Sequence, residues 1–182
     1  MHLQQTLRPK LAAIALIVFS ALAALPQSLR ADEKLIFGQI AGVSCQGAEN
    51  TAFPGFAVST FSFGDSLAAS ICSATGGAGA GKASFQDISV VKGLDDCTPA
   101  LFEAVAKGSP LASATLTVVA KGSKTPVLVI QLTGVFVTSD KFTEGAPHEL
   151  DEVITLAYTK ITITHVPSGK TVTIDVATNS VA

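Results

Sequence analysis

Residues 73–108 read SATGGAGAGKASFQDISVVKGLDDCTPALFEAVAKG, and this stretch decides how the fold is interpreted. Its middle part, from Ser84 to Val91, has the two-residue period of a β-strand. Its last part has Thr98 as an N-cap, Pro99 at the first helical position and Gly108 as a stop. The stretch therefore predicts a glycine-rich connection, a strand, and one short helix over about residues 97–107.

The glycines also raise the question of nucleotide binding, because Gly76, four residues and Gly81-Lys82 form the skeleton of a phosphate loop. Such a loop needs Ser or Thr directly after the lysine and a helix whose N-terminus holds the phosphate. Here Ala83 follows the lysine, and a strand is expected where the helix should begin. We therefore interpret the glycines as a flexible connector between two β segments, of a kind that is often functional.

Period-2 segments dominate the rest of the chain, and they are rich in Val, Ile, Thr and Phe. Gly134 interrupts one of them, where a bulge or bend is tolerated. Pro167-Ser168-Gly169 separates the last two as the turn of a hairpin. The predicted strand segments are 34–42, 56–65, 84–93, 112–122, 126–140, 152–166 and 170–178. The pattern predicts a mainly β protein with one helix.

The N-terminus carries the three parts of a secretory signal. Arg8 and Lys10 precede the uncharged run Leu11–Leu25, and a small residue, Ala31, ends the segment. We expect cleavage after Ala31, which leaves residues 32–182 as a single domain that is secreted or periplasmic and not membrane-bound. An uncleaved anchor is the alternative, although the apolar run is shorter than a membrane span needs.

Removal of residues 1–31 leaves nine lysines, no arginine and fourteen acidic residues, a net charge of −5. Arginine provides the planar group that grips phosphates and base edges. The composition of the mature chain therefore argues against nucleic-acid binding.

Several segments together resemble the haemolysin-coregulated protein (Hcp) family of type VI secretion. They are the opening EKLIFGQIAG, the stretch from Gly76 to Gly108 quoted above, ATLTVVAKG, VLVIQLTGVFVTS and ELDEVITLAYTKITI. The resemblance covers residues 34–165 in order. It implies an Hcp-like β-barrel of antiparallel strands with one short helix, assembled as a hexameric ring that serves as a tube subunit or a secreted effector carrier.

By this resemblance the glycine-rich loop reaches a neighbouring subunit or ring, and tip, sheath or effector proteins are possible partners. The expected contact residues are Ser73, Ala74, Thr75, Gly76, Gly77, Ala78, Gly79, Ala80, Gly81 and Lys82. The signal-like N-terminus departs from the family, because tube subunits leave through the secretion machine itself. An exported Hcp-like binding module, monomeric or of low oligomeric order, is therefore the alternative.

Cys45, Cys72 and Cys97 cannot be paired from their spacing alone. If the first three predicted strands form an antiparallel meander, Cys45 and Cys97 lie at one end of the sheet and Cys72 at the other. We therefore predict a Cys45–Cys97 disulfide with Cys72 unpaired. Three free thiols are the alternative, and they would favour a cytoplasmic or anchored protein.

Catalytic chemistry has little support in this sequence. The segment HELDE, from His148 to Glu152, could offer carboxylates to a divalent ion, but a solvated turn leading into a strand at Val153 is the more ordinary interpretation. His165 ends a Thr-rich strand and is expected at the surface. We predict no enzyme activity, no metal site and no cofactor.

Overall fold

The β-strands of this chain are built from the alternating segments described above. The computed structural model describes residues 33–45, 53–70, 79–145 and 149–181, so the proposed signal sequence over residues 1–31 lies outside them. Contacts group Lys34–Ala182 into one unit, which is the unit described here.

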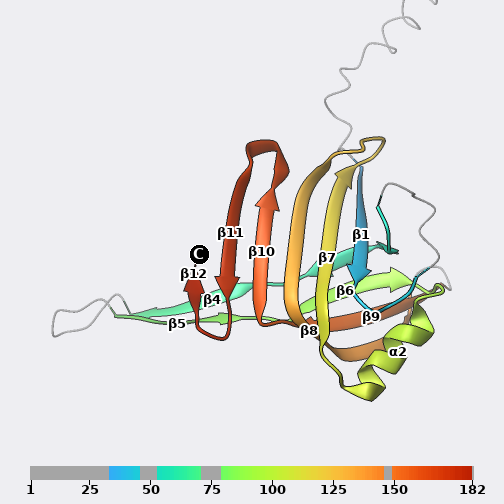
Figure 1. Ribbon diagram of the computed structural model, residues 1–182, viewed down its shortest axis with the longest axis horizontal. Helices are drawn as coiled ribbons and strands as arrows, with labels where there is room; N and C mark the ends of the chain where they lie inside the picture. Colours follow the sequence, from blue (N-terminus) through green and yellow to red (C-terminus); the bar gives the residue numbers. More distant parts are fainter. Residues whose placement is uncertain (1–32, 46–52, 71–78, 146–148, 182) are drawn as a thin grey trace, which may run out of the picture. The chain divides into compact units, whose positions relative to one another are not determined.

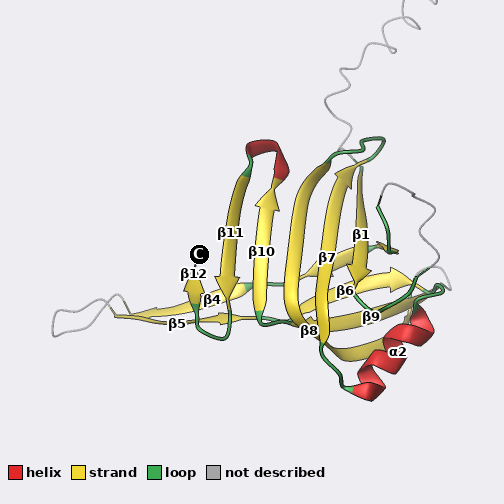
Figure 2. Cartoon of the chain, in the orientation of Figure 1, coloured by secondary structure: helices red, strands yellow, loops and turns green. Residues whose placement is uncertain are grey.

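The described part of this unit is mainly strand with one α-helix, as Figure 2 shows. The elements are β1 (Lys34–Ile40), β2 (Phe56–Val58), β3 (Thr60–Ser62), β4 (Asp65–Ser70), β5 (Gly79–Phe85), β6 (Ile88–Gly93), α2 (Thr98–Lys107), β7 (Leu111–Ala120), β8 (Pro126–Glu144), β9 (Leu150–Ala157), β10 (Lys160–His165), a 3-10 turn (Val166–Ser168), β11 (Lys170–Asp175) and β12 (Ser180–Val181). No helix among the described residues is long and apolar enough to cross a membrane.

Two antiparallel layers form a barrel-like circuit because β8 belongs to both (Figure 1). The first layer has the order β12-β11-β10-β8-β7-β1-β2, and in the second β6 pairs with β3 and β9, and β9 with β8. The chain also passes directly from β2, which pairs with β1, to β3, which pairs with β6. The strands thus close into a circuit, which confirms the predicted mainly β, antiparallel fold with one short α-helix.

Strand β8 changes layer at Gly134, where the sequence predicted a bend. Gly134 has a φ of +60°, and a Cβ atom there would lie 2.4 Å from the Thr159 hydroxyl oxygen. Before this point β8 pairs with β10, and after it β8 pairs with β9, with a register shift between Val137 and Ser139. A side chain at residue 134 would therefore meet both backbone strain and a steric clash.

Apolar side chains from both layers and from α2 meet between the layers. The fully buried ones include Phe56, Ile88, Val90, Leu101, Leu116, Ile130, Leu132, Ile154, Leu156 and Ile161. Leu101 attaches α2 to this core. The helix ends at Gly108 in the left-handed conformation, as predicted, with its backbone N–H bonded to Ala104 and Val105.

The structure divides three segments that the periodicity predicted as single strands. One of them, residues 152–166, becomes most of β9 and all of β10, with a break at Tyr158 and Thr159. Residues 56–65 become β2, β3 and the first residue of β4, and residues 84–93 become the end of β5 and all of β6. The break comes at Gly64 and Gln86, where the Gln86 backbone N–H donates to the Gly64 carbonyl oxygen at 2.9 Å. A period of two continues through such a break, so it does not show in the sequence. The hairpin turn at Pro167–Gly169 is confirmed.

Candidate functional site

Strands β4 and β5 form a separate two-stranded ribbon, and in Figure 1 they extend beyond the β12 edge of the larger sheet. Their register runs from Asp65 opposite Phe85 to Ser70 opposite Gly79, with a shift between Leu67 and Ala69. Among the described strands they pair only with each other. Each strand therefore has one edge of backbone donors and acceptors without a strand partner.

The described part of the glycine-rich segment belongs to this ribbon. Gly79, Ala80, Gly81 and Lys82 belong to β5, whereas Ser73, Ala74, Thr75, Gly76, Gly77 and Ala78 lie outside the described residues. The last four residues of the expected connector are thus strand. A Cβ atom on Gly81 would lie 3.0 Å from the Ala68 carbonyl oxygen, so glycine there permits a close strand-to-strand approach. A strand, not a helix, surrounds Lys82, so the structure lacks the phosphate-loop context.

The root of the ribbon is tied to the barrel. Beyond the Gly64–Gln86 bond, the Tyr158 hydroxyl donates to the Gln86 carbonyl oxygen at 3.1 Å. Phe61 and Phe63 stack with their ring centroids 6.2 Å apart just before β4 begins. These contacts fix the direction in which the ribbon leaves the barrel. Leu67, in the middle of β4, is nevertheless 54% exposed, which is unusual for a large apolar side chain on a short ribbon.

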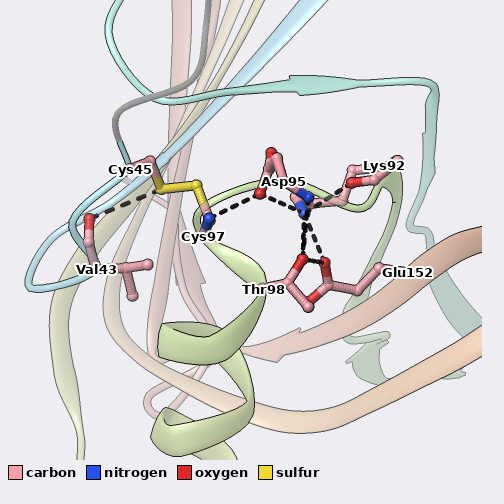
Figure 3. A network of polar contacts seen from close by, with 8 residues as sticks. Val43, Cys45, Lys92, Asp95, Cys97, Thr98 and Glu152 are labelled. Carbon is pink, nitrogen blue, oxygen red and sulfur yellow. Dashed lines mark hydrogen bonds and ion pairs between the residues drawn. A yellow bond between two sulfur atoms is a disulfide. The ribbon is translucent and has the colours of Figure 1, made fainter.

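A buried polar network joins the end of β6 to the start of α2 and to β9 (Figure 3). Lys92 and Glu152 are both fully buried, and the Lys92 ammonium group donates to Glu152 Oε2 at 2.5 Å. It also pairs with Asp95 Oδ1 at 2.8 Å. The Thr98 hydroxyl donates to the same Glu152 oxygen at 2.6 Å. Full burial of both ions makes the pair costly to break on one side.

Two expectations about these residues were wrong. Thr98 does not cap the helix; Cys97 is the N-cap residue, and its backbone N–H donates to Asp95 Oδ1 at 2.9 Å. Glu152 does not lie in a solvated turn, because β9 begins at Leu150 and turns this side chain inward. The two-residue period of the sequence could have predicted the burial of Lys92, because Lys92 follows Ile88 and Val90 on the inward face of β6. His148 lies outside the described residues.

Asp140 on β8 extends the network with an additional carboxyl group. Both of its oxygens and Glu152 Oε1 are buried without a hydrogen-bond partner. Burial, followed by the negative charge of Glu152, raises the pKa of Asp140 to about 6 against the opposing effect of Lys92. Within the described residues no group of three or more potential metal ligands gathers.

The two cysteines of the predicted pair meet beside this network. The structure joins Cys45 and Cys97 by a disulfide across 52 positions of sequence, as Figure 3 shows. The bond connects the segment after β1 to the residue that starts α2. Cys97 is fully buried, whereas Cys72 lies outside the described residues. His165 is exposed at the end of β10 and shares a hydrogen bond of 2.8 Å with Ser168.

Several solved structures share this architecture. A type six secretion system protein superposes with a TM-score of 0.71 at 21% identity, covering 82% of this chain and all of that one. Hcp1 from Salmonella typhimurium gives 0.68 at 18% identity, with 82% and 99% covered. A type VI secretion system effector from Yersinia pestis gives 0.61 at 19% identity, with 77% and 98% covered. These matches show a shared fold.

The sequence itself matches the family described as "Type VI secretion system effector, Hcp" over residues 39–165. No curated protein sequence matches the chain. The family match spans β2 to β10 in full and ends at His165, the last residue of β10, so β11 and β12 lie outside the matched residues. The helix, the projecting ribbon and the strands from β2 to β10 all lie within the matched residues, and the chain therefore belongs to the Hcp family of type VI secretion system effectors.

Proposed function

We propose that this protein is a non-enzymatic subunit that assembles with copies of itself into a ring, six subunits being the expected number. In this function it serves type VI secretion as a tube subunit or as a carrier that shelters effectors inside the ring. Membership of the Hcp family supports this class of function. The β4–β5 ribbon is the observation that carries the assembly part of the proposal.

Each strand of the ribbon has one edge without a strand partner among the described strands. An isolated two-stranded hairpin is at best marginally stable in water, and exposed strand edges pair readily with another chain. The ribbon exposes Leu67 and extends beyond the β12 edge. A neighbouring copy that packs on Leu67 would bury this apolar side chain. If the same copy adds a strand to one ribbon edge, it also supplies partners for the unpaired backbone donors and acceptors. Closed rings repeat one such contact around a symmetry axis.

The mass of the particle in solution tests the proposal. Light scattering coupled to size exclusion on residues 32–182, at two protein concentrations, is expected to give a mass of about six chains. The variant Leu67→Glu is expected to lower that mass, because a charge on the ribbon cannot be buried in a subunit contact. Leu94→Glu is a matched control on the turn before α2, where Leu94 is also exposed.

A particle that keeps its mass in Leu67→Glu would show that the ribbon is not the contact. A loss of mass in both variants would show a general effect of the added charge. Circular dichroism in the far ultraviolet would establish that each variant has kept its strand content.

A second candidate function has its own support in the disulfide. Disulfides form and persist in oxidising compartments, so Cys45–Cys97 favours a secreted or periplasmic protein, as does the proposed signal sequence over residues 1–31. In this alternative the protein is an exported Hcp-like binding module of low oligomeric order and takes no part in a tube. A wild-type mass of one chain at both concentrations would favour it over the ring.

A further inference from the structure

An apolar hollow of about 230 Å³ lies between the root of the β4–β5 ribbon and the strands β10 and β11. It is open on one side. Aromatic side chains come from the ribbon root and from the turn between β9 and β10, and branched aliphatic side chains come from β10 and β11. The side chains that line it include those of Phe63, Asp65, Phe85, Tyr158, Ile163 and Val172.

The hollow exists because the inward apolar face of the first sheet continues past the second layer. Ile130 on β8 is opposite Ile163 on β10, and Ile163 is opposite Val172 on β11. Ile130 is fully buried, Ile163 is half-buried, and Val172 is 37% exposed. Among the described elements, the ribbon root lies against Ile163 and Val172, the more exposed end of this row of side chains.

Among the described residues, the one charged side chain in the lining of the hollow is acidic. Asp65 is part of its lining. Burial raises the pKa of the Tyr158 hydroxyl, and the negative charges of Asp87 and Asp65 raise it further. Lys160 is opposite Asp175 on the other face of the sheet, and their charged groups are 3.9 Å apart. Lys170, opposite His165, is the next residue beyond Val172 on the lining face of β11 and is not part of the lining. The lining of the apolar hollow therefore includes one carboxylate, that of Asp65.

We propose that this hollow binds a small ligand with a single apolar ring and a protonated amine, of the size of a phenylalkylamine. A dry cavity of about 150 Å³ lined by aliphatic and aromatic side chains takes up benzene, so 230 Å³ has room for a ring with a short chain. Aromatic faces attract organic cations, and Asp65 adds a direct ionic contact for the amine. An apolar pocket with a few convergent polar groups is the usual form of a ligand site.

The chain offers its own probe for this site. It contains one tyrosine, Tyr158, which lines the hollow, and no tryptophan, so intrinsic tyrosine fluorescence reports on the hollow directly. Titration at low salt with 2-phenylethylamine is expected to give a saturable change, with a dissociation constant of about 0.1–1 mM for a ligand of this size. The uncharged 2-phenylethanol should bind roughly five-fold more weakly, and the anionic 3-phenylpropanoate more weakly still.

Two variants and a control separate the ring contact from the charge contact. Asp65→Asn should remove most of the preference for the amine and leave the affinity for the alcohol unchanged. Val172→Phe should fill the hollow and weaken both ligands at least five-fold. Leu94→Phe, at an exposed position before α2 that is not part of the lining, should change neither.

Absence of a saturable change up to 10 mM (about ten times the weakest expected constant) would overturn the proposal. So would equal affinities for the amine and the alcohol, or binding that Val172→Phe leaves unchanged. Because the readout is local to Tyr158, the result is independent of whether the protein forms a ring.

Discussion

Removal of the Cys45–Cys97 disulfide should destabilise this barrel by an amount that follows from the length of the chain it closes. A cross-link restricts the unfolded chain in proportion to the logarithm of the loop length. For the 52 positions between these cysteines, the chain-entropy relation gives about 4 kcal/mol at 25 °C. Substitution of both cysteines by alanine is expected to lower the free energy of unfolding by about this amount.

Urea unfolding followed by far-ultraviolet circular dichroism measures the effect. With a slope of about 2 kcal/mol per molar urea, the midpoint should fall by about 2 M. The Leu67→Glu background removes any contribution of subunit assembly to the stability, because assembly makes the midpoint depend on protein concentration. Treatment of the wild type with a reductant should reproduce the shift, and the variant Cys72→Ala should not.

A midpoint that moves by less than about 0.5 M in the double variant would refute the reasoning, because the unfolded chain would then not be closed at these two positions. A large shift in Cys72→Ala would refute it in another way, by showing that Cys72 belongs to the bridge. Peptide mapping under non-reducing conditions distinguishes these outcomes by direct identification of the linked cysteines.

Three further predictions concern buried charges and the bend in β8. Lys92→Met should cost roughly 3–5 kcal/mol, because it leaves Glu152 buried without its partner; adding Glu152→Leu should recover much of the loss in urea unfolding. The pKa of Asp140 in the folded state, about 6, lies above its ordinary 3.8, so its contribution to stability is complete below pH 3.8 and is lost as the pH rises through 6. Allowing for solvent screening, the loss is about 1–2 kcal/mol, and Asp140→Asn should flatten this part of a stability–pH curve. Gly134→Ala should lower the free energy of unfolding by roughly 1–3 kcal/mol, through its positive φ and the contact with Thr159; an unchanged midpoint would contradict this.

Local signals in the sequence predicted the helix well. Pro99 and Gly108 act through their own backbone geometry, so both ends of α2 could be placed within one residue. Gly134 was predictable for the same reason. The number of strands in each layer was not, because periodicity does not tell which partner a strand takes on each side.

The buried network shows where sequence reasoning failed and what could have corrected it. Glu152 was assigned to a solvated turn because it stands among other charged residues. Glu152 stands two residues before the inward-facing Ile154, so it belongs to the inward face of its strand. Lys92 stands two residues after the inward-facing Val90 and belongs to the inward face for the same reason. The sequence could therefore have predicted Lys92 and Glu152 as inward-facing residues of opposite charge on two strands. It does not show that these two strands are neighbours.

The role of β8 in both layers has a consequence for how the protein folds. Lys34 in β1 pairs with Ala120 in β7, 86 positions later, and β7 in turn pairs with β8. The first strand of the barrel therefore stays without this partner until most of the chain is available. Because β8 then connects both layers, loss of its pairing opens both at once. We expect slow folding, set by these distant pairings, and a single cooperative transition in which neither layer survives without the other.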